Sequence, residues 1–236
     1  MRTHLFDFMS VIITTSWDDG NRFDFRVSEM LEKFSLKGTF YIPVQYSHRD
    51  LDDKDVLKLS KKFEIGSHGL THTRLTSLGM GEKMKELVDS KKNLEKIVHK
   101  KIKCFAYPYG AYDTESLECV RSAGYTFART SKEFHLGKQK NTLVSHISLE
   151  LSNKISRLLS PRGFWYVITC GSWTRIAKRL FDKTPDNGVF HVFGHSWEIA
   201  KNNEWKKLEQ LFKYITSRKE FISLNNSELV IEKMMN

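Results

Sequence analysis

The chain has 236 residues, of which 40% are hydrophobic and 12% aromatic, so it can bury one substantial core and is not a disordered protein. Its formal net charge of +10 favours anionic partners such as nucleic acid, an acidic membrane surface or a phosphorylated substrate, although a soluble protein with a lysine-rich surface has the same charge. Three separated cysteines without a CxxC pair exclude a disulfide framework and a zinc knuckle.

No stretch approaches the roughly 20 apolar residues that a membrane span needs, and the N-terminal residues lack the apolar core of an export signal. We therefore expect a cytoplasmic protein without a membrane span. There is no internal repeat, linker or low-complexity segment, which predicts a single domain over residues 1–236.

Apolar strands and amphipathic helices alternate along the chain. Strand patterns occupy residues 11–16, 38–43, 63–67, 103–108, 125–130 and 188–194. Helical patterns occupy residues 25–36, 53–63, 81–99, 114–124, 173–183 and 204–217. Residues 132–162 have no clear pattern. Repeated strand–helix units predict an α/β fold with a mostly parallel sheet, open or closed into a barrel, and a ligand site at the carboxyl ends of the strands.

Unusual polar residues follow these predicted strands. Asp18 and Asp19 end the first strand in "IITTSWDDG", and "SHGLTH" places His68 and His72 four residues apart after the third. If Ser67 caps a short helical turn, both imidazoles lie on one face and share a metal. Two histidines and one carboxylate with open positions are typical of a catalytic zinc site, although HxxxH alone is weak evidence.

Two later strands end in further candidates. In "YPYG", Pro108 and Gly110 predict a sharp turn that aims a backbone N–H into the site as an oxyanion donor, although an ordinary turn has the same sequence. His195 follows "GVFHVFG" and is suited to general acid catalysis near neutral pH. His191, inside that strand, is interpreted as structural.

The order and spacing of "TSWDDG", "SHGLTH", "AYPYG" and "FGH" resemble the motifs of the polysaccharide deacetylase (NodB-like, carbohydrate esterase 4) family, from about residue 12 to residue 198. The resemblance implies a distorted (β/α) barrel and a hydrolase that removes N-acetyl groups from amino sugars. It also implies that Asp19, His68 and His72 bind a divalent metal, usually zinc, with cobalt and nickel as alternatives.

The same resemblance implies the catalytic roles. Asp18 is the general base for the attack of metal-bound water on the amide. The backbone N–H of Tyr109 stabilises the oxyanion together with the metal, and His195 protonates the leaving amine. Pro108 belongs to the motif that shapes this side of the substrate site.

The sequence departs from the family pattern in several places. Ala106 replaces the arginine that pairs with the catalytic aspartate, and our candidate for its replacement is Arg129, with a surface arginine as the alternative. The fourth motif, an Asp/Trp pair, is not recognisable in "TSKEFHLG", and we assign that role to neither Glu133 nor His135.

Aromatic residues beside the motifs are candidates for substrate binding. Trp17 stands where the family usually has phenylalanine, Phe193 replaces the leucine that lines the acetyl pocket, and Trp197 and Glu198 follow His195. The alternatives for these residues are core packing for the tryptophans and a surface position for Glu198. Trp165 also offers a stacking surface.

The leading hypothesis is therefore a metal-dependent hydrolase of an N-acylated amino sugar. A cytoplasmic location and a basic charge favour an intracellular precursor of a surface polysaccharide, linked to a nucleotide or to a lipid phosphate. The alternatives are hydrolysis of a non-sugar amide on the same fold and a catalytically inactive carbohydrate-binding module. We do not expect nucleic acid, because the lysines of "SKKNLEKIVHKKIK" alternate with apolar residues as on a solvated helix face. The sequence does not indicate the sugar, the acyl group or the oligomeric state.

Overall fold

The computed structural model describes residues 10–137, 140–153, 155–218 and 220–230. Its strands are β1 (Val11–Asp18), β2 (Thr39–Ile42), β3 (Glu64–Ser67), β4 (Cys104–Ala106), β5 (Phe127–Arg129), β6 (Leu149–Glu150), β7 (Val189–Gly194) and β8 (Phe221–Ser223). Its α-helices are α1 (Asp24–Lys33), α2 (Asp53–Leu59), α3 (Met80–Val98), α4 (Thr114–Ser122), α5 (Pro161–Cys170), α6 (Trp173–Asp182), α7 (Ser196–Lys201) and α8 (Trp205–Arg218). Three short 3₁₀ helices are η1 (Leu75–Ser77), η2 (Pro108–Gly110) and η3 (Ile155–Leu159).

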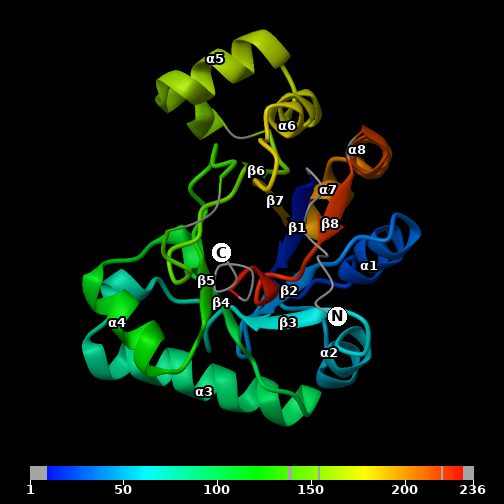
Figure 1. The fold of residues 1–236 in the computed structure, drawn as a ribbon. Helices are drawn as coiled ribbons and strands as arrows, with labels where there is room; N and C mark the ends of the chain where they lie inside the picture. Colours follow the sequence, from blue (N-terminus) through cyan, green and yellow to red (C-terminus); the bar gives the residue numbers. More distant parts are fainter. Residues whose placement is uncertain (1–9, 138–139, 154, 219, 231–236) are drawn as a thin grey trace, which may run out of the picture.

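The strands form one parallel sheet in the order β5-β4-β3-β2-β1-β7-β6, and β8 pairs with the first residues of β1. The helices lie outside this curled sheet (Figure 1). Strand β1 is central, since it runs beside β7 from Ile12↔Val189 to Trp17↔Gly194. The parallel sheet with outer helices confirms the predicted distorted (β/α) barrel.

The segment without a clear sequence pattern completes the ring of strands. On one side, the Ser145 amide donates to Ala128 of β5 and the Thr130 amide donates to Ser145. On the other side, the Ser148 amide donates to His191 of β7, and β6 follows directly. Irregular backbone therefore closes the barrel between β5 and β6, which explains why its residues show no strand periodicity.

The core lies between the sheet and the helices and inside the curl of the sheet. All of β1 is buried, as a run of β-branched residues predicts for a central parallel strand. Trp17 belongs to this core: its side chain is fully buried and its indole N–H donates to Thr15 Oγ1 at 3.3 Å. The prediction that Trp17 contacts substrate is therefore wrong.

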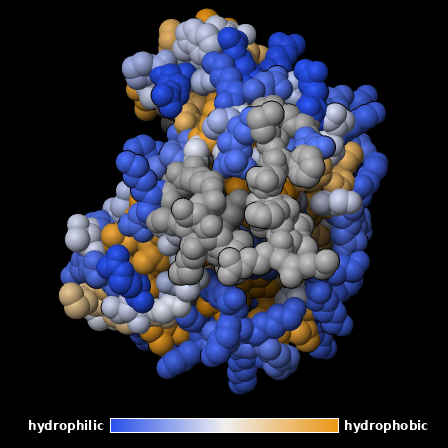
Figure 2. All heavy atoms as spheres, viewed as in Figure 1, coloured by the Kyte–Doolittle hydropathy of each residue, from blue (hydrophilic) through white to orange (hydrophobic). Residues whose placement is uncertain are grey.

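Helices α5 and α7 and strands β6 and β8 had no counterpart among the predicted elements. In α5 the buried residues are Gly163, Tyr166 and Cys170, while several large apolar residues are exposed, so its apolar residues do not mark the face that packs on the core. Elsewhere the surface is largely hydrophilic, as the face in Figure 2 shows. Within the described residues, no helix is long and apolar enough to cross a bilayer.

Candidate active site and metal centre

Two adjacent carboxylates reach the same pocket because the backbone adopts a left-handed conformation at the second of them. Asp18 is the last residue of β1, and Asp19 adopts a left-handed φ of 80°. Neighbouring side chains of a regular strand point to opposite faces, so this turn is what lets both carboxylates line one pocket. Both side chains are buried.

The two histidines converge through a loop and not through a helical turn. His68 follows β3, and left-handed residues at Gly69 (φ 86°) and His72 (φ 62°) fold the chain back. The prediction that Ser67 caps a helical turn is therefore wrong. The buried Glu86 of α3 holds the loop, since it accepts the backbone N–H groups of Leu70 and Thr71 at 2.8 and 3.0 Å.

Asp19, His68 and His72 present one ligand atom each within 4.8 Å of one another. The Nε2 atoms of the histidines lie 3.1 Å apart, and two imidazole nitrogens on one tetrahedral zinc ion lie about 3.3 Å apart. Asp19 Oδ1 is 3.7 Å from His72 Nε2, and within the described residues this buried oxygen has no hydrogen-bond partner. These three residues therefore fit a divalent metal.

The protonation of the histidines suits the same role. His68 Nδ1–H donates to the Ala106 carbonyl at 2.8 Å, which leaves Nε2 unprotonated and directed at the site. Burial lowers the pKa of His72 to about 4, so its ring is a neutral ligand at physiological pH.

Arg129 lies directly against Asp18. Its Nη2 donates to both carboxylate oxygens, at 2.6 Å to Oδ2, and both side chains are buried. The rings of Tyr41 and Phe193 flank the guanidinium, with Cζ 5.0 and 4.1 Å from their centres. Burial alone would raise the pKa of Asp18, but the charges of Arg129 and the nearby histidines outweigh it and hold the pKa below its usual value.

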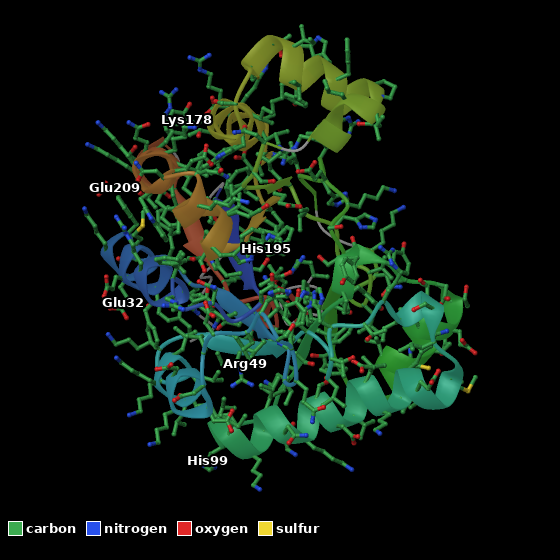
Figure 3. All side chains as sticks on the ribbon, turned by 180° about the vertical axis from the view of Figure 1, so that it is seen from behind. Glu32, Arg49, His99, Lys178, His195 and Glu209 are labelled. Atoms are coloured by element: carbon green, nitrogen blue, oxygen red, sulfur yellow. The ribbon has the colours of Figure 1, made fainter. Side chains whose placement is uncertain are left out.

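His195, which is labelled in Figure 3, is fixed by the helix that follows it. It precedes α7, and its Nδ1–H donates to Glu198 Oε2 at 3.2 Å, so Nε2 faces Asp19 Oδ2 at 3.7 Å. Burial favours the neutral ring, but the hydrogen bond with Glu198 and the charges of Asp18 and Asp19 outweigh it and raise the pKa of His195 to about 9. The ring therefore carries a proton at neutral pH.

Trp197 contacts a proposed metal ligand. Its indole N–H donates to Asp19 Oδ2 at 3.1 Å, which leaves Oδ1 facing the histidines. The Trp197 ring also lies 5.5 Å from the His195 ring. Trp197 lines the pocket, as expected, but its indole N–H is hydrogen-bonded to Asp19.

The pocket has a volume of about 410 Å³ and aromatic walls. Tyr46 and Tyr109 flank the His72 ring, with ring centres 4.6 and 4.9 Å away. Tyr109 adopts a left-handed φ of 60° in η2 and its side chain is exposed at the rim. Pro108 is buried beneath this turn, between pocket-lining residues, and its substrate contact stays a prediction. Phe193 does line the pocket.

Three residues of the site were missed from the sequence. Glu86 shows a recognisable signal, an acidic residue on the apolar face of the helix at 81–99. Tyr46 and the buried Glu150, which lines the pocket beside His195 and Glu198, follow no motif. Trp165 lies on α5, away from the pocket-lining residues.

The sequence was compared with family models and with curated proteins. The model of the polysaccharide deacetylase family matches residues 9–128, just over half of the chain. The chain belongs to the polysaccharide deacetylase family. No curated protein sequence matches it.

Solved structures of this family share the fold. A deacetylase structure from Mycobacterium smegmatis superposes with a TM-score of 0.74 at 12% identity, covering 96% of this chain and 91% of that one. A family 4 acetyl xylan esterase from Clostridium thermocellum, solved with a cobalt ion, gives 0.65 at 14% identity, covering 94% and 92%. A mutant of BA3943, described as a family pseudoenzyme with restored activity, gives 0.62 at 15% identity, covering 94% and 68%.

Proposed function

We propose that this family member is a metal-dependent hydrolase that removes an N-acetyl or other N-acyl group from an amino sugar. The observation that carries the proposal is one pocket holding an Asp–His–His ligand set, a second carboxylate paired with arginine, and a histidine beside both. These parts match what amide hydrolysis requires: a metal, a base and an acid.

Asp19, His68 and His72 would hold the metal. When bound, a divalent cation supplies a Lewis acid that polarises the amide carbonyl and lowers the pKa of water. Zinc suits two imidazoles and one carboxylate, and cobalt and nickel accept the same ligands. Trp197 orients Asp19 by donating to Oδ2.

The proton transfers are assigned to two other residues. Asp18 is kept ionised by Arg129 and accepts the proton of the attacking water. His195 is protonated, is oriented by Glu198 and donates from Nε2 to the leaving nitrogen. The backbone N–H of Tyr109 is our candidate for a further donor to the developing oxyanion.

For the substrate we propose an N-acylated amino sugar linked to a nucleotide or to a lipid phosphate, an intracellular precursor of a surface polysaccharide in the cytoplasm. The net charge of +10 supports a phosphate-bearing substrate, because long-range attraction raises its local concentration. The aromatic walls formed by Tyr46 and Tyr109 support a sugar, whose apolar ring face stacks on such side chains.

Metal content and acetate release test the proposal together. Wild-type protein, loaded with zinc and dialysed, is analysed by elemental mass spectrometry beside Asp19→Ala, His72→Ala and Asp18→Asn. We expect about one metal per chain in wild type and Asp18→Asn, and loss of the metal in the other two variants. Acetate release from nucleotide-linked and lipid-linked N-acetyl sugars should fall in all three variants.

The outcomes separate the alternatives. A wild-type protein that takes up no zinc, cobalt or nickel would contradict the hydrolase proposal and favour the catalytically inactive carbohydrate-binding module. A protein that binds metal and hydrolyses simple acetamides but no N-acetyl sugar would favour the non-sugar amide hydrolase.

A further inference from the structure

Large apolar side chains are gathered at one place on the surface. Of the nine exposed large hydrophobic residues in the described part of the chain, five fall between residues 158 and 168. We call them the apolar patch: Leu158, Leu159, Phe164, Trp165 and Ile168, which are 40%, 87%, 52%, 43% and 68% exposed. Scattered apolar residues are normal on a protein surface, but a contiguous group marks an interaction site.

The patch stands at the outer edge of the molecule. Helix α5 packs on η3 and α6, and α6 in turn packs on β6 and β7, so α5 forms the outermost layer in Figure 1. The inward residues of α5 are Gly163, Tyr166 and Cys170, which leaves its other face to present the aromatic and aliphatic side chains.

Basic residues form the rim of the patch. Arg179 lies over the Trp165 ring with Cζ 4.3 Å from its centre, and Lys183 Nζ lies 5.3 Å from it. Arg162 is on α5 itself, and Arg175 donates to the Cys170 carbonyl at the end of α5, at 3.5 Å. Residues 155–183 contain a single acidic residue, Asp182.

We propose that the apolar patch and its basic rim dock this protein on a membrane surface rich in anionic lipid. Helices that lie in the bilayer interface typically combine tryptophan, phenylalanine and leucine with arginine and lysine. The long basic side chains keep their charged ends at the phosphates while their stems cover apolar surface, and each strengthens binding to an anionic bilayer.

A bilayer fits this surface better than a second copy of the chain does. A symmetric dimer through the patch would bring the rim of one copy, with its four cations, against the same cations of the other. An anionic membrane neutralises them instead.

The patch also lies close to the active-site pocket. The buried Arg157 of η3 donates to the carbonyl of Glu150 at 2.5 Å and to Ser152, and Glu150 lines the pocket. The exposed Leu158 and Leu159 come directly after this anchor. Taken with the proposed lipid-linked substrate, docking through the patch would bring the protein to the membrane that carries this substrate.

Flotation of the full chain with vesicles tests the docking independently of any enzymatic activity. We compare vesicles of phosphatidylcholine alone with vesicles that also contain phosphatidylglycerol, at low and high salt. We expect wild type to float with the anionic vesicles, less so at high salt. Leu159→Glu and Ile168→Glu should each lower the vesicle-bound fraction about tenfold or more, because each replaces an exposed apolar side chain that would enter the bilayer with a negative charge that anionic lipid repels. Charge reversal at Arg175 and Lys183 should abolish the preference for anionic lipid.

Met80→Glu is the matched control, since Met80 is 61% exposed at the start of α3, outside the patch. It should float like wild type. Tryptophan fluorescence should shift to the blue with anionic vesicles, and the shift should be lost in Trp165→Phe. Wild type that does not float, or equal losses in Met80→Glu, would overturn the proposal. A dimer in light scattering that Ile168→Glu dissociates, without flotation of wild type, would assign the patch to self-association.

Discussion

At the scale of single residues, the pairing of Arg129 with Asp18 supplies what the usual family arginine supplies elsewhere. Position 106 has only a methyl side chain, yet its carbonyl accepts the proton of His68. The missing guanidinium comes from the end of β5, one strand further along the sheet from β4, which carries Ala106. Asp18 therefore has a guanidinium partner although position 106 supplies none.

Replacement of Arg129 by alanine should therefore change both the rate and its pH dependence. Without the guanidinium, burial is opposed less strongly and the pKa of Asp18 rises, so the acidic limb of kcat/KM against pH moves to higher pH. We expect a loss of about 10²-fold or more in kcat/KM at neutral pH. Arg129→Lys, which keeps the charge, should recover part of both effects. An unchanged acidic limb in Arg129→Ala would exclude Asp18 as the base.

Trp197 offers a second test at this scale. Trp197→Phe keeps an aromatic ring on the side of His195 but removes the indole N–H that holds Asp19 Oδ2, together with part of the indole ring. Because groups that orient metal ligands typically contribute 10- to 100-fold, we expect metal affinity to fall by about tenfold, measured by competition with a chromogenic chelator. Equal affinity in the variant would show that Asp19 needs no such partner.

At the scale of elements, α3 positions the histidine loop through one carboxylate. Glu86 accepts two backbone N–H groups and the hydroxyl of Thr71, at 2.7 Å for the last. A helix that only packs on the sheet would not need a buried acid at this position. The helix therefore fixes the path of residues 68–72 without touching the metal site.

Glu86→Ala should lower both stability and metal affinity. We expect a loss of about 1–3 kcal/mol in the free energy of unfolding, because the buried N–H of Leu70 and the partly buried N–H of Thr71 lose their acceptor. We also expect a weaker metal site. Asp113→Ala is the control: Asp113 caps α4 by accepting from Ser116 N at 2.7 Å, so its loss costs about 1 kcal/mol. Chemical denaturation and metal titration of both variants check this, and a Glu86→Ala protein with intact metal affinity would contradict it.

The regular elements could be predicted from the sequence, whereas the loops that shape the site could not. The strands and most helices could be predicted because burial of one face makes hydrophobic residues recur at regular intervals. The place of the site could be predicted because residues at the carboxyl ends of neighbouring parallel strands lie close together. The left-handed backbone at Asp19 and His72 could not be predicted, because it depends on hydrogen bonds such as those of Glu86, far away in the sequence. Closure of the barrel by Ser145 and Ser148 is likewise set by non-local backbone pairing.

At the scale of the whole molecule, a buried acid makes stability depend on pH. Asp24, at the start of α1, is fully buried, and within the described residues neither carboxyl oxygen has a well-formed hydrogen bond. Burial raises the pKa of Asp24 from 3.8 to about 8. The Ser196 hydroxyl acts to lower this pKa, but the charge of Asp19 acts to raise it. At neutral pH the folded protein therefore holds a proton that the unfolded chain releases.

The sign of the effect follows from this difference. Between pH 3.8 and about 8 the folded state binds more protons than the unfolded state, so stability falls as pH rises, by up to about 1.4 kcal/mol per pH unit. Asp24→Asn should remove this slope and be more stable than wild type by a few kcal/mol near pH 8. Urea unfolding of the metal-free proteins across this range measures it, and parallel pH profiles for the two proteins would refute the assignment.

The central place of β1 also governs how the chain reaches its fold. Ile12 pairs with Val189 and Val11 with Phe221, so two of the three neighbours of the first strand are synthesised long after it. Until then the apolar strand that ends in the two aspartates keeps an open edge, ready to pair with another nascent chain. The three proposed metal ligands follow β1 and β3, which β2 joins early in the chain, whereas His195 enters the site only when β7 pairs with β1. The metal centre can therefore form before the general acid is in place.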